Sequence, residues 1–153
     1  MADAPDTLCY RRLAGYRYQT LEPFELRLHL PLALPEPARI PATEGGPWVR
    51  LGRRGKLKIR AGYAWDGARG PAIDTRDFMR ASLVHDALYQ LMRAGELDHR
   101  HWRPWADRVL RDLVIADGMG SFRASYVHTL ARWFGARDAR RSDRHTRLRR
   151  YAP

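Results

Sequence analysis

The chain has 153 residues, 44% of them apolar, so it is long enough to bury the core of an ordinary domain. No segment approaches the roughly 20 apolar residues of a membrane span, and the single cysteine, Cys9, excludes an internal disulfide and an all-cysteine zinc site. The 28 basic residues against 17 acidic ones give a net charge of +11, and all but two of the basic residues are arginines. This excess favours partners that carry phosphate, either anionic lipid or nucleic acid.

The first half of the chain predicts a small antiparallel sheet. Residues 1–47 contain several prolines, which allow only short or edge strands. Residues 48–51 and 56–65 flank a four-residue connection with glycine at each end, which is typical of a β-hairpin. In the second of these strands, apolar residues alternate with Lys56, Lys58 and Arg60, which predicts one buried face and one charged face.

The second half predicts three helices. After a loop rich in glycine, the first helix begins near Asp74 or Thr75 and ends at Gly95; the others cover about 103–116 and 121–134. Residues 136–153 carry seven arginines and two aspartates with few apolar residues, so we expect a mobile or loosely docked tail. The prediction is an α+β fold with one globular domain over residues 1–135, in which an N-terminal β-hairpin or small antiparallel sheet packs on a three-helix core.

The first helix carries the candidate site residues His85, Asp86 and Tyr89. His85 is the candidate general base, because an imidazole can take a proton from water when a carboxylate fixes its other nitrogen. Asp86 points about 100 degrees away around the helix, so it is free to act as an oxygen ligand, together with carbonyls of the glycine-rich loop, for a hard cation such as calcium. The orienting carboxylate would come from the second helix. It is either Asp107 or Asp112, which lie about 140 degrees apart, so only one can face the histidine.

Four motifs carry a resemblance to a known family. They are Gly-Tyr-Ala-Trp-Asp-Gly-Ala-Arg-Gly-Pro at 62–71, Val-His-Asp-Ala-Leu-Tyr at 84–89, Ala-Asp-Arg-Val-Leu at 106–110 and Ala-Arg-Trp-Phe-Gly at 131–135. In order and spacing they resemble a phage and prophage family catalogued as "domain of unknown function 1353", which implies no settled activity. The His-Asp-x-x-Tyr helix between a glycine loop and an Ala-Asp helix is in turn similar to the catalytic core of phospholipase A2. This second resemblance implies that the helical core is phospholipase A2-like.

The resemblance to phospholipase A2 implies a role for each candidate residue. His85 matches the base that activates water, and Tyr89 matches the tyrosine that helps to orient the aspartate supporting that base. Asp107 matches this aspartate by its Ala-Asp-x-x-Leu context, and Asp112 is its rival. The calcium ligands would be the Asp86 carboxylate and backbone carbonyls of the loop, which are those of Trp65, Gly67 and Arg69.

These observations predict a calcium-dependent, phospholipase A2-like hydrolase of glycerophospholipid esters, of phage or prophage type, that binds anionic membranes through its arginines. The alternative is a non-enzymatic phage or prophage protein for virion assembly or host interaction, in which the His-Asp-Tyr cluster is a buried structural network. Nucleic-acid binding is a third possibility, which has the charge but no recognition helix or aromatic RNA-binding motif. Residues 1–20 form no apolar signal core, so we expect synthesis in the cytoplasm, followed by association with a virion or delivery to a membrane.

Overall fold

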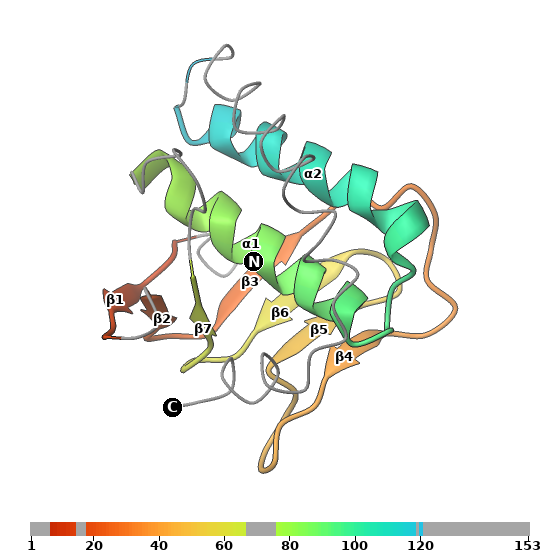
Figure 1. Cartoon of the computed structure of the whole chain (residues 1–153), viewed down its shortest axis with the longest axis horizontal. Helices are drawn as coiled ribbons and strands as arrows, with labels where there is room; N and C mark the ends of the chain where they lie inside the picture. The colour runs from red at the N-terminus through yellow and green to blue at the C-terminus, as the bar shows by residue number, and fades with distance from the viewer. Residues whose placement is uncertain (1–6, 15–17, 67–75, 119, 121–153) are drawn as a thin grey trace, which may run out of the picture. The chain divides into compact units, whose positions relative to one another are not determined.

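The structure is a computed structural model that describes residues 7–14, 18–66, 76–118 and 120 (Figure 1). The chain divides into two compact units, with the boundary between Trp65 and Asp66. The first unit contains the seven described strands, and the second contains the two described helices. Neither of these helices has the length and apolar character needed to cross a bilayer.

Seven short strands form two antiparallel sheets in the first unit. The three-stranded sheet has the order β1 (Tyr10–Arg12), β2 (Tyr18–Thr20), β7 (Ala64–Trp65). The four-stranded sheet has the order β3 (Phe24–Arg27), β6 (Lys56–Ile59), β5 (Val49–Leu51), β4 (Ala38–Ile40). The predicted hairpin is confirmed, because β5 pairs with β6, and Leu57 and Ile59 are buried while Lys56 and Lys58 are exposed.

The predicted strand over residues 56–65 is in fact two strands in different sheets. Gly62 has φ of +90°, which glycine adopts at little cost, and the N–H of Tyr63 donates to the carbonyl of Arg60 at 3.3 Å. The chain therefore turns after β6. The next residues form β7, which pairs with β2 of the three-stranded sheet.

The turn between β5 and β6 is tied to the segment that follows β3. The N–H of Leu28 donates to the carbonyl of Gly55 at 2.8 Å, and the N–H of Leu34 donates to the carbonyl of Arg53 at 3.0 Å. Gly55 has φ of +95°, and a Cβ atom at this position would lie 2.0 Å from the carbonyl oxygen of Leu28. Only glycine allows the two backbones to approach so closely.

We expect Gly55→Ala to lower the free energy of unfolding by about 3 kcal/mol, because alanine is strained at this φ and its methyl group would displace backbone. Gly95→Ala is the matched control. Gly95 has φ of +77° with nothing within 4 Å of the added Cβ, so only the backbone cost of about 1–2 kcal/mol applies. Urea denaturation measures both variants, and equal losses would contradict the close approach at Gly55.

Two helices, α1 (Arg76–Arg93) and α2 (His99–Ala116), follow in the second unit. Gly95 ends α1 as predicted: its N–H donates to the carbonyl of Met92, and the N–H of Glu96 donates to that of Leu91, which is the Schellman pattern. The second helix begins earlier than the predicted residue 103. Asp98 is its N-cap and accepts from the N–H of Arg100, and Pro104 lies inside the helix.

The predicted fold, an N-terminal β-hairpin or small antiparallel sheet packed on a three-helix, phospholipase A2-like core, is wrong. The described residues form two helices and seven strands in two antiparallel sheets, so only the mixture of α and β elements agrees with the expectation. The missed strands β1, β2 and β4 are three residues each, too short to give a period-2 pattern. The predicted third helix at 121–134 and the tail at 136–153 lie outside the described residues, and the single domain over 1–135 stays a prediction.

Candidate functional site

The site lies where α1 packs against α2, which run side by side in Figure 1. An apolar cluster of Phe78, Ala81, Leu110 and Val114 joins the two helices. At the same end, Arg80 forms a bidentate ion pair with Asp117: Nε and Nη2 lie 3.0 and 2.7 Å from the two carboxylate oxygens. Apolar packing and a fork-shaped ion pair together fix the register of the helices.

Three residues from the two helices form a hydrogen-bonded cluster, which we call the His85 cluster: His85 and Tyr89 of α1, and Asp107 of α2. Nε2 of His85 lies 2.9 Å from Oδ1 of Asp107, and the hydroxyl of Tyr89 donates to the same oxygen at 2.6 Å. Because His85 and Tyr89 are four residues apart, they stand one above the other on the helix. Their rings lie 4.2 Å apart between centroids.

The hydrogen bonds assign different tasks to the two ring nitrogens of His85. In the tautomer of His85 that carries its hydrogen on Nε2, this nitrogen donates to Oδ1 of Asp107. Nδ1 is then the nitrogen that can take a proton. Asp107 is fully buried, and its second oxygen, Oδ2, has no hydrogen-bond donor among the described residues. The hydrogen bonds from His85 and from Tyr89 both go to Oδ1. Together they fix the orientation of the imidazole.

His85 and Asp86 are more exposed than their neighbours on α1. From Ala81 to Met92, every position of α1 is buried except His85 and Asp86. The side chain of His85 is 13% exposed. A histidine that served only to join two helices would need no access, whereas a base that acts on a bound molecule does.

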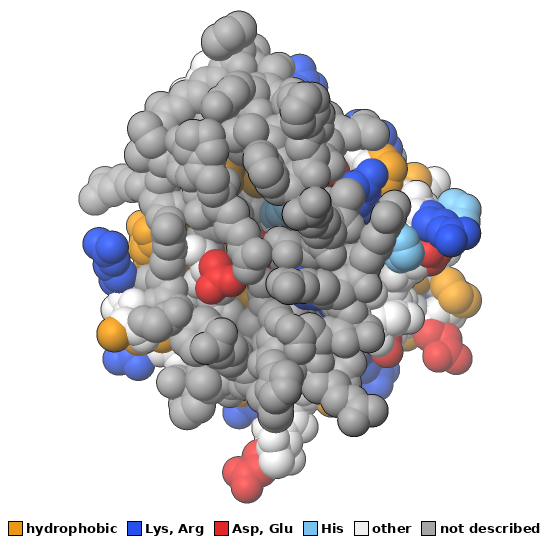
Figure 2. Space-filling model, viewed as in Figure 1, with side chains coloured by type: hydrophobic (Ala, Val, Ile, Leu, Met, Phe, Trp, Pro, Cys, Tyr) orange, Lys and Arg blue, Asp and Glu red, His pale blue; other side chains and the backbone are white. Residues whose placement is uncertain are grey.

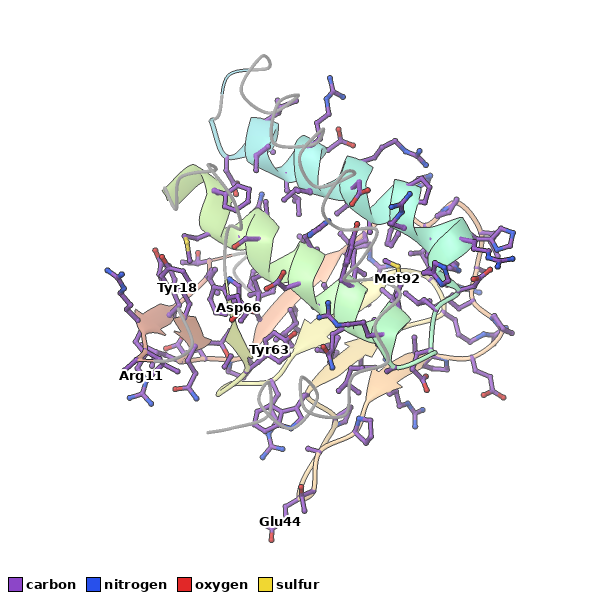
Figure 3. All side chains as sticks on the ribbon, in the orientation of Figure 1. Arg11, Tyr18, Glu44, Tyr63, Asp66 and Met92 are labelled. Carbon is purple, nitrogen blue, oxygen red and sulfur yellow. The ribbon has the colours of Figure 1, made fainter. Side chains whose placement is uncertain are left out.

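Asp86 lies beside the first residue of the second unit. The backbone N–H of Asp66 donates to Oδ2 of Asp86 at 3.3 Å, and Figure 3 shows Asp66 next to α1. Trp65, a predicted carbonyl ligand, is a buried residue of β7 in the first unit. The other two, Gly67 and Arg69, lie outside the described residues. In the described ranges, no group of three or more His, Cys, Asp or Glu side chains could hold a metal ion.

Asp107, and not its rival Asp112, contacts His85. The side chain of Asp112 is 72% exposed, with Arg111 Nη1 3.9 Å away. The apolar face of α2, which carries Leu110 and Val114, decides the matter because it turns Asp107 inward.

Sequence reasoning missed three features of the second unit: the Arg80–Asp117 pair, the N-cap at Asp98 and the bond from Asp66 to Asp86. Only the N-cap had a local signal, an aspartate just before a run of helix-forming residues. Comparisons with family models, with curated proteins and with solved structures give no match to this chain.

Proposed function

We propose that this chain is a calcium-dependent, phospholipase A2-like hydrolase of glycerophospholipid esters, with His85 as the general base. One observation carries the proposal. Oδ1 of the buried Asp107 holds Nε2 of His85 at 2.9 Å and the Tyr89 hydroxyl at 2.6 Å, while His85 keeps partial exposure. A base of this kind needs a fixed imidazole with one nitrogen left for the substrate water.

The proposed reaction begins when Nδ1 of His85 takes a proton from a water molecule, which attacks the ester carbonyl carbon. The imidazolium that forms is stabilised by the negative charge of Asp107, and it later returns the proton to the leaving alcohol. Tyr89 is a positioning residue, because it acts through Asp107. A second hydrogen bond to Oδ1 keeps the carboxylate from rotating away when the imidazole becomes charged.

Asp86 supplies the chemistry that a calcium ion requires. It is a half-buried carboxylate in an otherwise buried stretch of α1, and it accepts a hydrogen bond from the N–H of Asp66, which directly precedes the glycine-rich segment of the sequence. Hard oxygen ligands of this kind suit calcium. A bound calcium ion would stabilise negative charge on the carbonyl oxygen and on the phosphate of the lipid.

The competing function is a helix lock, in which the His85 cluster only joins α1 to α2. The burial of Tyr89 and Asp107 favours it. However, the packing of Phe78 and Leu110 and the Arg80–Asp117 pair already join these helices. The partial exposure of both His85 and Asp86 favours a site that meets a ligand.

A release assay on mixed phospholipid vesicles, with added calcium or with chelator, tests the proposed function. We expect fatty acid release only with calcium, and we expect Asp86→Asn to weaken calcium binding about tenfold by removing a charged ligand. Asp112→Asn is the matched control, because it removes the same charge from an exposed side chain. Absence of calcium-binding heat by isothermal titration, with and without lipid, would contradict the proposal.

A further inference from the structure

The first unit contains a basic pocket remote in sequence from the His85 cluster. It has a volume of about 460 Å³ and lies between the end of β3, the segment after it and the β5–β6 turn. The described residues that line it include three arginines, Arg27, Arg53 and Arg54, and none of these described lining residues is acidic. This part of the pocket wall is therefore positively charged, which favours an anionic occupant.

Backbone hydrogen bonds fix the segments that carry the pocket arginines. Both ends of residues 28–34 bond to the β5–β6 turn, Leu28 to the carbonyl of Gly55 and Leu34 to the carbonyl of Arg53. The Nε of Arg53 also donates to the carbonyl of Leu34 at 3.1 Å. A guanidinium has five N–H donors in a rigid fork, so this bond orients the group and keeps other donors available for oxygen atoms. Such forks match the oxygen spacing of a phosphate.

The same segment carries an exposed apolar side chain. Leu32 is 62% exposed, and it lies between the two backbone ties, next to Ala33, which lines the pocket. A leucine at the tip of a braced loop beside arginines is the combination that binds an anionic membrane: the arginines take phosphates, and the leucine enters the apolar region. Nucleic acid would use the arginines but would gain nothing from the exposed leucine.

We infer that this pocket, formed by Arg27, Arg53 and Arg54, binds the phosphate of an anionic lipid headgroup while Leu32 inserts into the bilayer. The choice of lipid over other phosphates rests partly on the proposed function. The described residues that line the pocket all belong to the first unit and include no residue of the His85 cluster. Figure 2 shows described Lys and Arg side chains at several separate places on the face that it draws.

Co-sedimentation of the full-length chain with phosphatidylglycerol-rich vesicles, in chelator to prevent turnover, tests this inference. We expect Arg53→Gln/Arg54→Gln to lower the vesicle affinity about thirtyfold, since each arginine near an anionic surface contributes about 1 kcal/mol. The matched control is Arg12→Gln/Arg108→Gln, which removes the same charge from exposed positions on β1 and α2. The control double variant should lower the vesicle affinity by a factor severalfold smaller than the loss of about thirtyfold expected for the pocket variant. Equal losses in the two double variants would overturn the inference, because they would show that only net charge matters.

Leu32→Ser separates the lipid from other sources of phosphate. We expect it to lower vesicle affinity about tenfold and to leave the binding of inorganic phosphate unchanged by isothermal titration. An unchanged vesicle affinity would overturn the lipid assignment, and so would a pocket variant that loses duplex DNA binding while keeping vesicle binding. Co-sedimentation in chelator measures binding and not turnover. If the protein binds vesicles through the pocket but releases no fatty acid in the separate calcium assay, this inference is supported and only the proposed function is contradicted.

Discussion

His85→Gln is expected to lower the rate of phospholipid hydrolysis by about a thousandfold, within the range that general-base catalysis contributes. Glutamine is similar in length to histidine and can still donate a hydrogen bond to Oδ1 of Asp107. It cannot accept a proton from water near neutral pH. The variant should therefore keep the fold and lose turnover, which is measured by fatty acid release together with thermal unfolding by circular dichroism.

His101→Gln is the matched control for this substitution. His101 is a histidine of α2 with a side chain 82% exposed, and it contacts the carboxylate of the N-cap residue Asp98. Its replacement should leave the rate unchanged and change the unfolding temperature only slightly, because glutamine can still donate to this carboxylate. If His85→Gln unfolded the protein, and wild type were inactive on every lipid tested, the helix lock would be the correct function. His85→Gln thus distinguishes the two functions. Loss of activity with the fold intact supports the hydrolase, and loss of the fold in a protein that has no activity supports the helix lock.

Much of the site could be predicted because it depends on spacing within helices. The interval between His85 and Tyr89 fixes a shared face, and the apolar periodicity of 103–116 predicts which side of α2 turns inward. The structure decides between Asp107 and Asp112 by that inward side, because Asp107 is buried and Asp112 is exposed. The contacts that hold α2 against α1, which are the apolar cluster with Phe78 and Leu110 and the Arg80–Asp117 ion pair, could not be predicted. Single-sequence patterns contain no such information on contacts between elements.

The fold was predicted less well, for a physical reason that the segment 56–65 illustrates. Its alternation of apolar and charged residues correctly predicts the buried and the exposed side of β6. The positive φ of Gly62 then sent the following residues to a different sheet, where Tyr18 pairs with Trp65. Periodicity reports which face is buried but not which partner strand covers it. Short strands such as β1 and β2 depend almost wholly on such partners.

Asp107→Asn is expected to lower the rate of hydrolysis at least about a hundredfold, because a neutral amide cannot stabilise the imidazolium that forms at His85. The amide oxygen still accepts bonds from Nε2 and from Tyr89, so the loss of unfolding free energy should be modest. The new amide N–H group would lie where Oδ2 now lies. That site is buried with no partner among the described residues, which predicts a cost of about 1–3 kcal/mol.

Tyr89→Phe and Asp112→Asn complete the test. Tyr89→Phe keeps the charge of Asp107 but removes one of the two bonds to Oδ1, so it should lower the rate by a smaller factor, about tenfold, with a stability loss of about 1 kcal/mol. Asp112→Asn repeats the amide substitution on an exposed position of the same helix and should change neither quantity. A cluster that served only as a helix lock would give similar losses of stability in Asp107→Asn and Tyr89→Phe. Wild type itself would then release no fatty acid for either variant to reduce, so the rate and not the unfolding temperature separates the two functions.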